Sequence, residues 1–199
     1  MSQFLSIWIT LFFVFTPFFA LTMFLSMTEG YDESHRRRLA VTVSISVAVL
    51  CLILFFAGKQ LFALFGITLD AFRIGAGALL FLSGVALVQG RAANAGASSD
   101  GDVAVVPLAM PIIVGPATTG TLLVMGAELE GIQVKLIGTL ALLAAVACIA
   151  AVLLLSAYIQ RGLGVRGIGI LSKLTGLVLA ALSAQMVMTG VQGFLGIHA

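Results

Sequence analysis

Apolar residues follow one another along this chain in long uncharged runs, which short polar segments separate. Five of these runs are long enough for a helix that crosses a hydrocarbon core, which takes about 20 residues. A sixth run, residues 74–88, reaches that length when Ala71 and Phe72 are added and Arg73 extends its charge to the membrane surface. The pattern therefore predicts an all-α integral membrane protein with six transmembrane helices. The five longer runs are residues 1–28, 39–58, 103–127, 136–159 and 174–199.

Composition agrees with this class, because 61% of the residues are hydrophobic and only 9% are charged, against about 25% charged in soluble domains. The net charge of +2 is small and scattered, so membrane lipid is an expected partner and nucleic acid is not. Cys51 and Cys148 fall inside apolar runs, where cysteine acts as a small hydrophobe. His35 lies in a loop and His198 is next to last, which leaves no catalytic or metal-ligand set in the spans. We therefore expect neither an enzyme nor a bound cofactor.

Basic residues are unequally divided between the two sides of the predicted membrane. Seven of the ten lie in the segments after spans one, three and five, and three lie on the other side. Short loops rich in Lys and Arg stay in the cytoplasm, so both termini are expected on the outer side. The seven are Arg36, Arg37, Arg38, Arg91, Arg161, Arg166 and Lys173, and the three are Lys59, Arg73 and Lys135.

Three prolines, Pro107, Pro111 and Pro116, interrupt the fourth apolar run. Each removes a backbone donor and clashes with the carbonyl four residues earlier. The run therefore predicts a fourth helix broken into two halves at Gly115-Pro116, and Thr16-Pro17 gives the first helix a break of the same form, with Thr16 as the cap. Free backbone groups at membrane depth are tolerated only when they are buried in protein or line a polar cavity, so broken helices indicate a transporter's substrate site.

The two halves of the chain align with each other at offsets near one hundred. Three spans in each half is an odd number, so the second half would enter the membrane from the opposite side. We predict one membrane domain of two inverted three-helix repeats, residues 1–91 and 103–199, joined by a cytoplasmic linker at 92–102, with chance alignment as the alternative. The matches at offset 99 are Thr16-Pro17 with Gly115-Pro116 and Glu29 with Glu128, and those at offset 100 are Arg73 with Lys173, Leu82-Ser83 with Leu182-Ser183 and Gly90 with Gly190.

The two helix starts define the predicted substrate site. Proline at the first helical position leaves the following amides free, and the positive end of the helix dipole attracts an anionic group. Carbonyls at the ends of the preceding half-helices could accept from an ammonium group or a cation, so a zwitterion fits both ends. No Asp, Glu, Lys or Arg lies within the five longer spans, which favours a small neutral amino acid. The predicted substrate-binding residues are Thr16, Pro17, Phe18, Phe19, Thr22, Val114, Gly115, Pro116, Ala117, Thr118 and Thr119.

Several alternatives stay open at the level of the sequence. The breaks could be simple kinks. The protein could instead be a channel or efflux pore for another small polar solute, or an accessory subunit without a substrate. Any coupling to H+ or Na+ is unassigned. Glu128 is expected to be a solvated carboxylate, and Asp70 with Arg73 an exposed pair three residues apart. Small residues such as Gly84 and Gly176 predict close packing of spans three and six, and the alanine-rich fifth span suits a scaffold or a homo-oligomer interface.

The stretch from Pro107 to Thr119, PLAMPIIVGPATT, together with the six spans and the RIGAG start of span three, resembles the MarC family of bacterial inner-membrane proteins. That family includes SnatA-type transporters of small neutral amino acids. The resemblance covers nearly the whole chain and implies an inverted-repeat transporter of glycine- or alanine-sized substrates in an inner membrane. The first half departs from the family's usual Asp-Pro-x-Gly-Asn-x-Pro, because residues 16–22 read TPFFALT and keep only the first proline.

Overall fold

The computed structural model describes residues 2–28, 30–90 and 113–196, and over those residues its regular structure is helical throughout. Five stretches are long and apolar enough to cross a membrane, in agreement with a multi-pass all-α protein. The first part of the predicted fourth span and the linker at 92–102 lie outside the described residues, so six spans in two repeats stays a prediction. The helices are α1 (Ser2–Val14), α2 (Pro17–Met27), α3 (Glu33–Phe65), α4 (Leu69–Gln89), α5 (Pro116–Glu128), α6 (Ile132–Leu154) and α7 (Ser156–Leu195).

The first apolar run contains two helices, since α1 ends at Val14 and α2 begins at Pro17. Between them, Thr16 takes a left-handed conformation with φ 49° and ψ 59°. An N-cap residue that bonds the first turn through its side chain normally has extended backbone angles. Thr16 makes no such side-chain bond, so its predicted role as a capping threonine is wrong, although it occupies the cap position.

Two helices continue through segments that lie between the predicted spans, residues 59–69 and 160–173, for which the charged and glycine residues predicted loops. α3 extends to Phe65 and ends at Gly66, which has a left-handed φ of 63°, so most of the expected loop at 59–69 is helical. α7 runs through the expected loop at 160–173 and is interrupted only at Gly164, with φ 64° and ψ 170°. Charge and glycine mark the membrane boundary, but they do not stop a helix unless a residue adopts a turn conformation.

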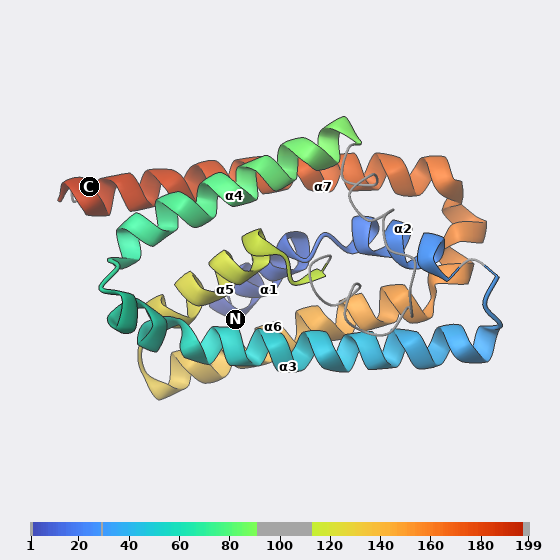
Figure 1. The fold of residues 1–199 in the computed structure, drawn as a ribbon, viewed down its shortest axis with the longest axis horizontal. Helices are drawn as coiled ribbons and strands as arrows, with labels where there is room; N and C mark the ends of the chain where they lie inside the picture. Colours follow the sequence, from blue (N-terminus) through green and yellow to red (C-terminus); the bar gives the residue numbers. More distant parts are fainter. Residues whose placement is uncertain (1, 29, 91–112, 197–199) are drawn as a thin grey trace.

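The helices lie in an elongated bundle (Figure 1). α4 and α7 form an antiparallel pair along one side, α3 and α6 form a second antiparallel pair along the other, and α1, α2 and α5 lie between the pairs. α2 and α5 both begin near the middle of the molecule and run toward opposite ends. The two helix starts that begin with proline are therefore interior features of the fold.

Glycines bring the backbones of α4 and α7 into contact, as the small residues in these spans predicted. A methyl group added at Gly84 would lie 2.8 Å from the carbonyl oxygen of Gly176, and one added at Gly176 would lie 2.7 Å from the carbonyl oxygen of Gly84. Fourteen residues further along α7, or about four turns, Gly190 packs against the backbone of Asp70. These contacts fix the register of the antiparallel pair, with the end of α7 beside the start of α4.

The outer surface of the bundle is apolar. Large aliphatic side chains such as Ile45, Ile53 and Leu140 are more than half exposed, and similar residues follow the length of α3, α6 and α7. A soluble monomer rarely exposes so continuous an apolar surface. Lipid is therefore the environment that these helix faces fit.

Candidate functional site

The starts of α2 and α5 share a proline at the first helical position, although the preceding Thr16 is left-handed and the preceding Gly115 is extended. The first turns close with hydrogen bonds of 2.9 Å, from the amide of Ala20 to the carbonyl of Thr16 and from the amide of Thr119 to the carbonyl of Gly115. The two amides that follow each proline precede this first closed turn and have no acceptor within their own helix. Both helices thus direct free donors and the positive dipole end toward the interior of the molecule.

Thr118 joins the two interruptions. Its hydroxyl donates to the carbonyl of Ile113, at 3.0 Å, and lies 3.5 Å from the carbonyl of Val14, the last residue of α1. The side chain is buried, with 3% of its surface exposed. One hydroxyl of the second half therefore contacts carbonyls that belong to both breaks, which the sequence predicted as free acceptors.

The remaining predicted residues lie around this contact. Phe19 and Ala117 pack in one apolar cluster with Val14 and Leu80, and Val114 belongs to the main core. The Thr22 hydroxyl donates to the carbonyl of Phe18 at 2.9 Å. The structure thus brings parts of the two motifs together, while substrate binding by them stays a prediction. Pro17 is buried, Thr16, Phe18, Gly115 and Thr119 are partly buried, and Pro116 is exposed.

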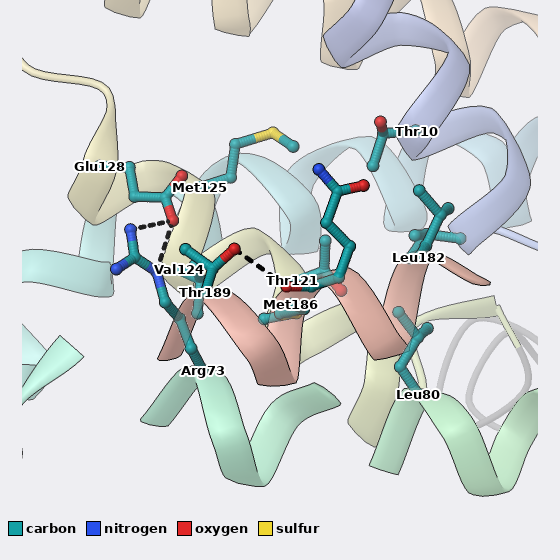
Figure 2. Close-up of a pocket in the computed structure, with 12 residues that line it drawn as sticks. Thr10, Arg73, Leu80, Thr121, Val124, Met125, Glu128, Leu182, Met186 and Thr189 are labelled. Carbon is teal, nitrogen blue, oxygen red and sulfur yellow. Dashed lines mark hydrogen bonds and ion pairs between the residues drawn. The ribbon is translucent and has the colours of Figure 1, made fainter. Parts of the chain in front are cut away.

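A cavity of about 310 Å³ lies between α1, α4, α5 and α7 (Figure 2). None of the eleven predicted substrate-binding residues lines it, but its inner end includes Val14, whose carbonyl faces Thr118, and Thr121, one turn further along α5. No local sequence pattern indicates this cavity, because its walls come from four separate helices. It is lined by Thr10, Val14, Arg73, Leu80, Thr121, Val124, Met125, Glu128, Leu182, Gln185, Met186 and Thr189.

Charged residues occupy one end of this cavity. The guanidinium of Arg73 donates from Nε to Glu128 Oε1 at 2.8 Å and from Nη2 to the same oxygen at 2.5 Å. Its Nη1 donates to Asp70 Oδ1 at 2.5 Å. The Asp70–Arg73 pair was predicted, but it is only partly exposed. Glu128 is exposed, as predicted for a solvated carboxylate, and α5 in addition delivers that carboxylate to Arg73 on α4. Burial of the Arg73 side chain to 18% exposure makes these bonds stronger than in a fully exposed pair.

Comparison with known proteins agrees with this membrane architecture. The model of a protein family described as "MarC family integral membrane protein" matches residues 1–195 of the chain. The chain belongs to the MarC family. This confirms at the family level the resemblance seen in the proline motif. No solved structure matches the chain.

MarC relatives are similar to this chain over nearly their full length. UPF0056 membrane protein MJ1677 of Methanocaldococcus jannaschii is 32% identical over 194 residues, which cover 94% of each chain. A UPF0056 membrane protein of Aquifex aeolicus is 30% identical over 200 residues, or 96% of this chain and 94% of that protein. UPF0056 membrane protein YhcE of Escherichia coli is 29% identical over 194 residues, or 93% and 90%. These names state a membrane protein and no activity.

Proposed function

We propose that this MarC protein is a membrane transporter of small neutral amino acids, glycine- or alanine-sized, that binds its substrate where α1, α2 and α5 meet. The observation that carries the proposal is the contact of Thr118 with the carbonyls of Ile113 and Val14. It brings a helix start and the end of a preceding helix together in the protein interior. The free amides suit a carboxylate, and the second lone pair of each carbonyl suits an ammonium group, so a zwitterion is the matching solute.

The packing of the helices supports two repeats of opposite orientation. α5 packs against α4 and α3, and α2 packs against α7 and α6, so each short helix contacts the two long helices of the other half. α2 and α5 run from the middle toward opposite ends of the molecule (Figure 1). A pair of inverted repeats would produce this reciprocal packing, in which the short helix of each half contacts the long helices of the other. Alternating access in such folds moves one repeat against the other. We place the protein in a bacterial inner membrane, with both termini on the outer side.

Counterflow of labelled alanine into liposomes tests the proposal. The parent protein should give saturable uptake against preloaded unlabelled alanine, as expected for a secondary carrier. Flux that rises linearly with concentration would indicate a channel, and absence of both binding and flux would indicate an accessory subunit. Repeating the assay over a panel of amino acids, with imposed H+ or Na+ gradients, would assign substrate range and coupling.

Two substitutions examine the site itself. Pro116→Ala lets the helix continue through Gly115 and withdraws the free amides, and Thr118→Val keeps the shape of the side chain but removes the hydroxyl. Each should weaken alanine binding by roughly 5- to 150-fold, as loss of an interaction of about 1–3 kcal/mol does. Thr139→Val is the matched control, because the Thr139 hydroxyl also donates to a helix carbonyl, at 2.8 Å, but lies away from the breaks. Monodisperse variants with parental affinity would contradict the site.

A further inference from the structure

The cavity between α1, α4, α5 and α7 has one polar end and one apolar end. Packing of Gly190 against Arg73 and Asp70 places the neighbouring Thr189 level with the start of α4. Glu128 ends α5 and bonds Arg73, so these groups share the polar end. Figure 2 shows Arg73, Glu128 and Thr189 together, with Leu80 and Leu182 away from them.

The threonines on the cavity wall present acceptors. Thr121 donates its hydroxyl proton to the carbonyl of Ala117 at 3.0 Å, and Thr189 donates its proton to the carbonyl of Gln185 at 2.9 Å. A hydroxyl has one proton and two lone pairs, so the oxygens of these two residues remain able to accept. A donor that enters the cavity therefore meets oxygen atoms already oriented by their helices.

The charged groups at the polar end do not balance. One guanidinium, that of Arg73, bonds two carboxylates, those of Asp70 and Glu128, which leaves one net negative charge at neutral pH. Both bonds between Arg73 and Glu128 use the same oxygen, Oε1. The second oxygen of Glu128 can accept a further donor, and a positive group there would neutralise the excess charge.

We propose that this cavity is a second binding site, which receives the ammonium group of a small amine-bearing solute at Glu128. The oxygen of Thr189 accepts one of its remaining protons, and its apolar part extends toward Leu80 and Leu182. A volume of about 310 Å³ is at the small end of ligand pockets, which run from about 300 to 1,000 Å³. It is roughly ten times the volume of one water molecule, more than a single metal ion fills.

The site is independent of the two helix starts in its residues, and it rests on the proposed function only for the choice of alanine as the natural ligand. The inner end of the cavity lies beside Val14 and therefore borders the proposed midplane site, while Glu128 lies at the other end. A carboxylate on the same solute can accept from the side-chain amide of Gln185 or the hydroxyl of Thr10, which also line the cavity. The cavity therefore selects its ligand mainly by the amine group.

Three ligands of similar size separate the contributions of the ammonium group and of the carboxylate to binding. Purified protein is titrated with alanine, with ethylamine, which lacks the carboxylate, and with propionate, which lacks the ammonium group. Alanine and ethylamine should bind competitively, and propionate should neither bind at this site nor displace ethylamine. Binding of propionate in place of ethylamine would overturn the proposal, as would ethylamine binding that Na+ alone abolishes by occupying the cavity.

Two variants with matched controls locate the site. Glu128→Gln should weaken ethylamine binding at least tenfold, roughly the effect of losing a hydrogen bond to a charged group, and Thr189→Val should weaken it severalfold. Glu33→Gln removes a carboxylate that is 73% exposed at the start of α3, and Thr139→Val removes an equivalent hydroxyl on α6, so both should retain parental affinity. Thr189→Ser keeps the hydroxyl and should retain affinity near that of the parent, and an equal loss of affinity in Thr189→Ser would assign the effect to packing instead of the hydroxyl.

The outcomes distinguish this site from the proposed transport function. Ethylamine binding that depends on Glu128, in a protein that neither binds nor transports amino acids, would support the cavity and refute the transport proposal. Alanine binding that Thr118→Val removes and Glu128→Gln leaves unchanged would support the midplane site and refute the cavity site. Unchanged ethylamine affinity in monodisperse Glu128→Gln protein would refute the cavity site in either case.

Discussion

Thr16 is the sole non-glycine residue with a positive φ in the part of the chain that the structure describes. A branched side chain in the left-handed region approaches the following carbonyl, which costs roughly 1–2 kcal/mol. Strain of this kind persists only where the surroundings impose it, and here it lies at the interruption between α1 and α2. The conformation sets the direction in which α2 leaves the middle of the molecule.

Thr16→Asn should stabilise the protein by about 1 kcal/mol, because asparagine tolerates the left-handed region better than a branched residue. The measurement is the thermal unfolding midpoint of purified protein in detergent. Thr68→Asn is the control, since Thr68 has an ordinary φ of −72° and caps α4 by accepting from the amide of Ala71, a role that asparagine also fills. A lower midpoint for Thr16→Asn than for the parent would contradict the strain assigned to Thr16.

At the scale of the elements, the tightest glycine contacts in the described part of the chain lie between α3 and α5. A methyl group at Gly126 would lie 1.8 Å from the carbonyl oxygen of Phe55, and one at Gly58 would lie 2.3 Å from that of Leu123. Both obstacles are backbone atoms, which cannot move aside without shifting a helix. This crossing holds α5 against the other half of the chain and therefore determines where Glu128 meets Arg73.

Gly126→Ala should destabilise the protein by about 3 kcal/mol or more, since the added carbon overpacks a contact between two backbones. Gly75→Ala is the matched control, because Gly75 is also helical and a methyl group there meets nothing within 4 Å. The control should be neutral or stabilising by up to about 1 kcal/mol, from the better helix propensity of alanine. Size-exclusion profiles and unfolding midpoints would decide, and equal behaviour of the two variants would contradict the crossing.

Element starts were easier to predict than element ends. Pro17 and Pro116 begin helices as predicted, because proline at the first helical position has a local cause. The helical stretch at 160–173 was not predicted, because polar and glycine residues resemble a loop when only composition is considered. The Arg73–Glu128 contact joins residues 55 positions apart and depends on how α4 and α5 pack, which no local pattern encodes.

At the scale of the whole molecule, the antiparallel packing of α4 and α7 places the end of α7 beside the start of α4. The C-terminal end of the described chain therefore lies on the same side of the bundle as Asp70, Arg73 and Glu128. In the predicted topology this is the outer side, which carries three of the ten basic residues. The polar end of the cavity then faces outward.

Reporter fusions test this orientation. A reporter after Arg38, after residue 96 or after Arg166 should report the cytoplasm, and one at the C-terminus should report the outer side. The expectation follows because most Lys and Arg residues lie in the three segments that carry the first three reporters. A cytoplasmic C-terminus would rule out inverted repeats with three spans each.

The interruption at Thr16 also has a consequence for biosynthesis. α1 and α2 have 13 and 11 residues, so each is about 20 Å long or less and neither crosses a bilayer core of roughly 30 Å alone. They have to insert together, with the break at membrane depth. The hydroxyl that reaches the Val14 carbonyl belongs to Thr118, which leaves the ribosome 104 residues later. At about 5–20 residues per second that delay is roughly 5–20 s, during which the insertion machinery or water has to shelter the broken span.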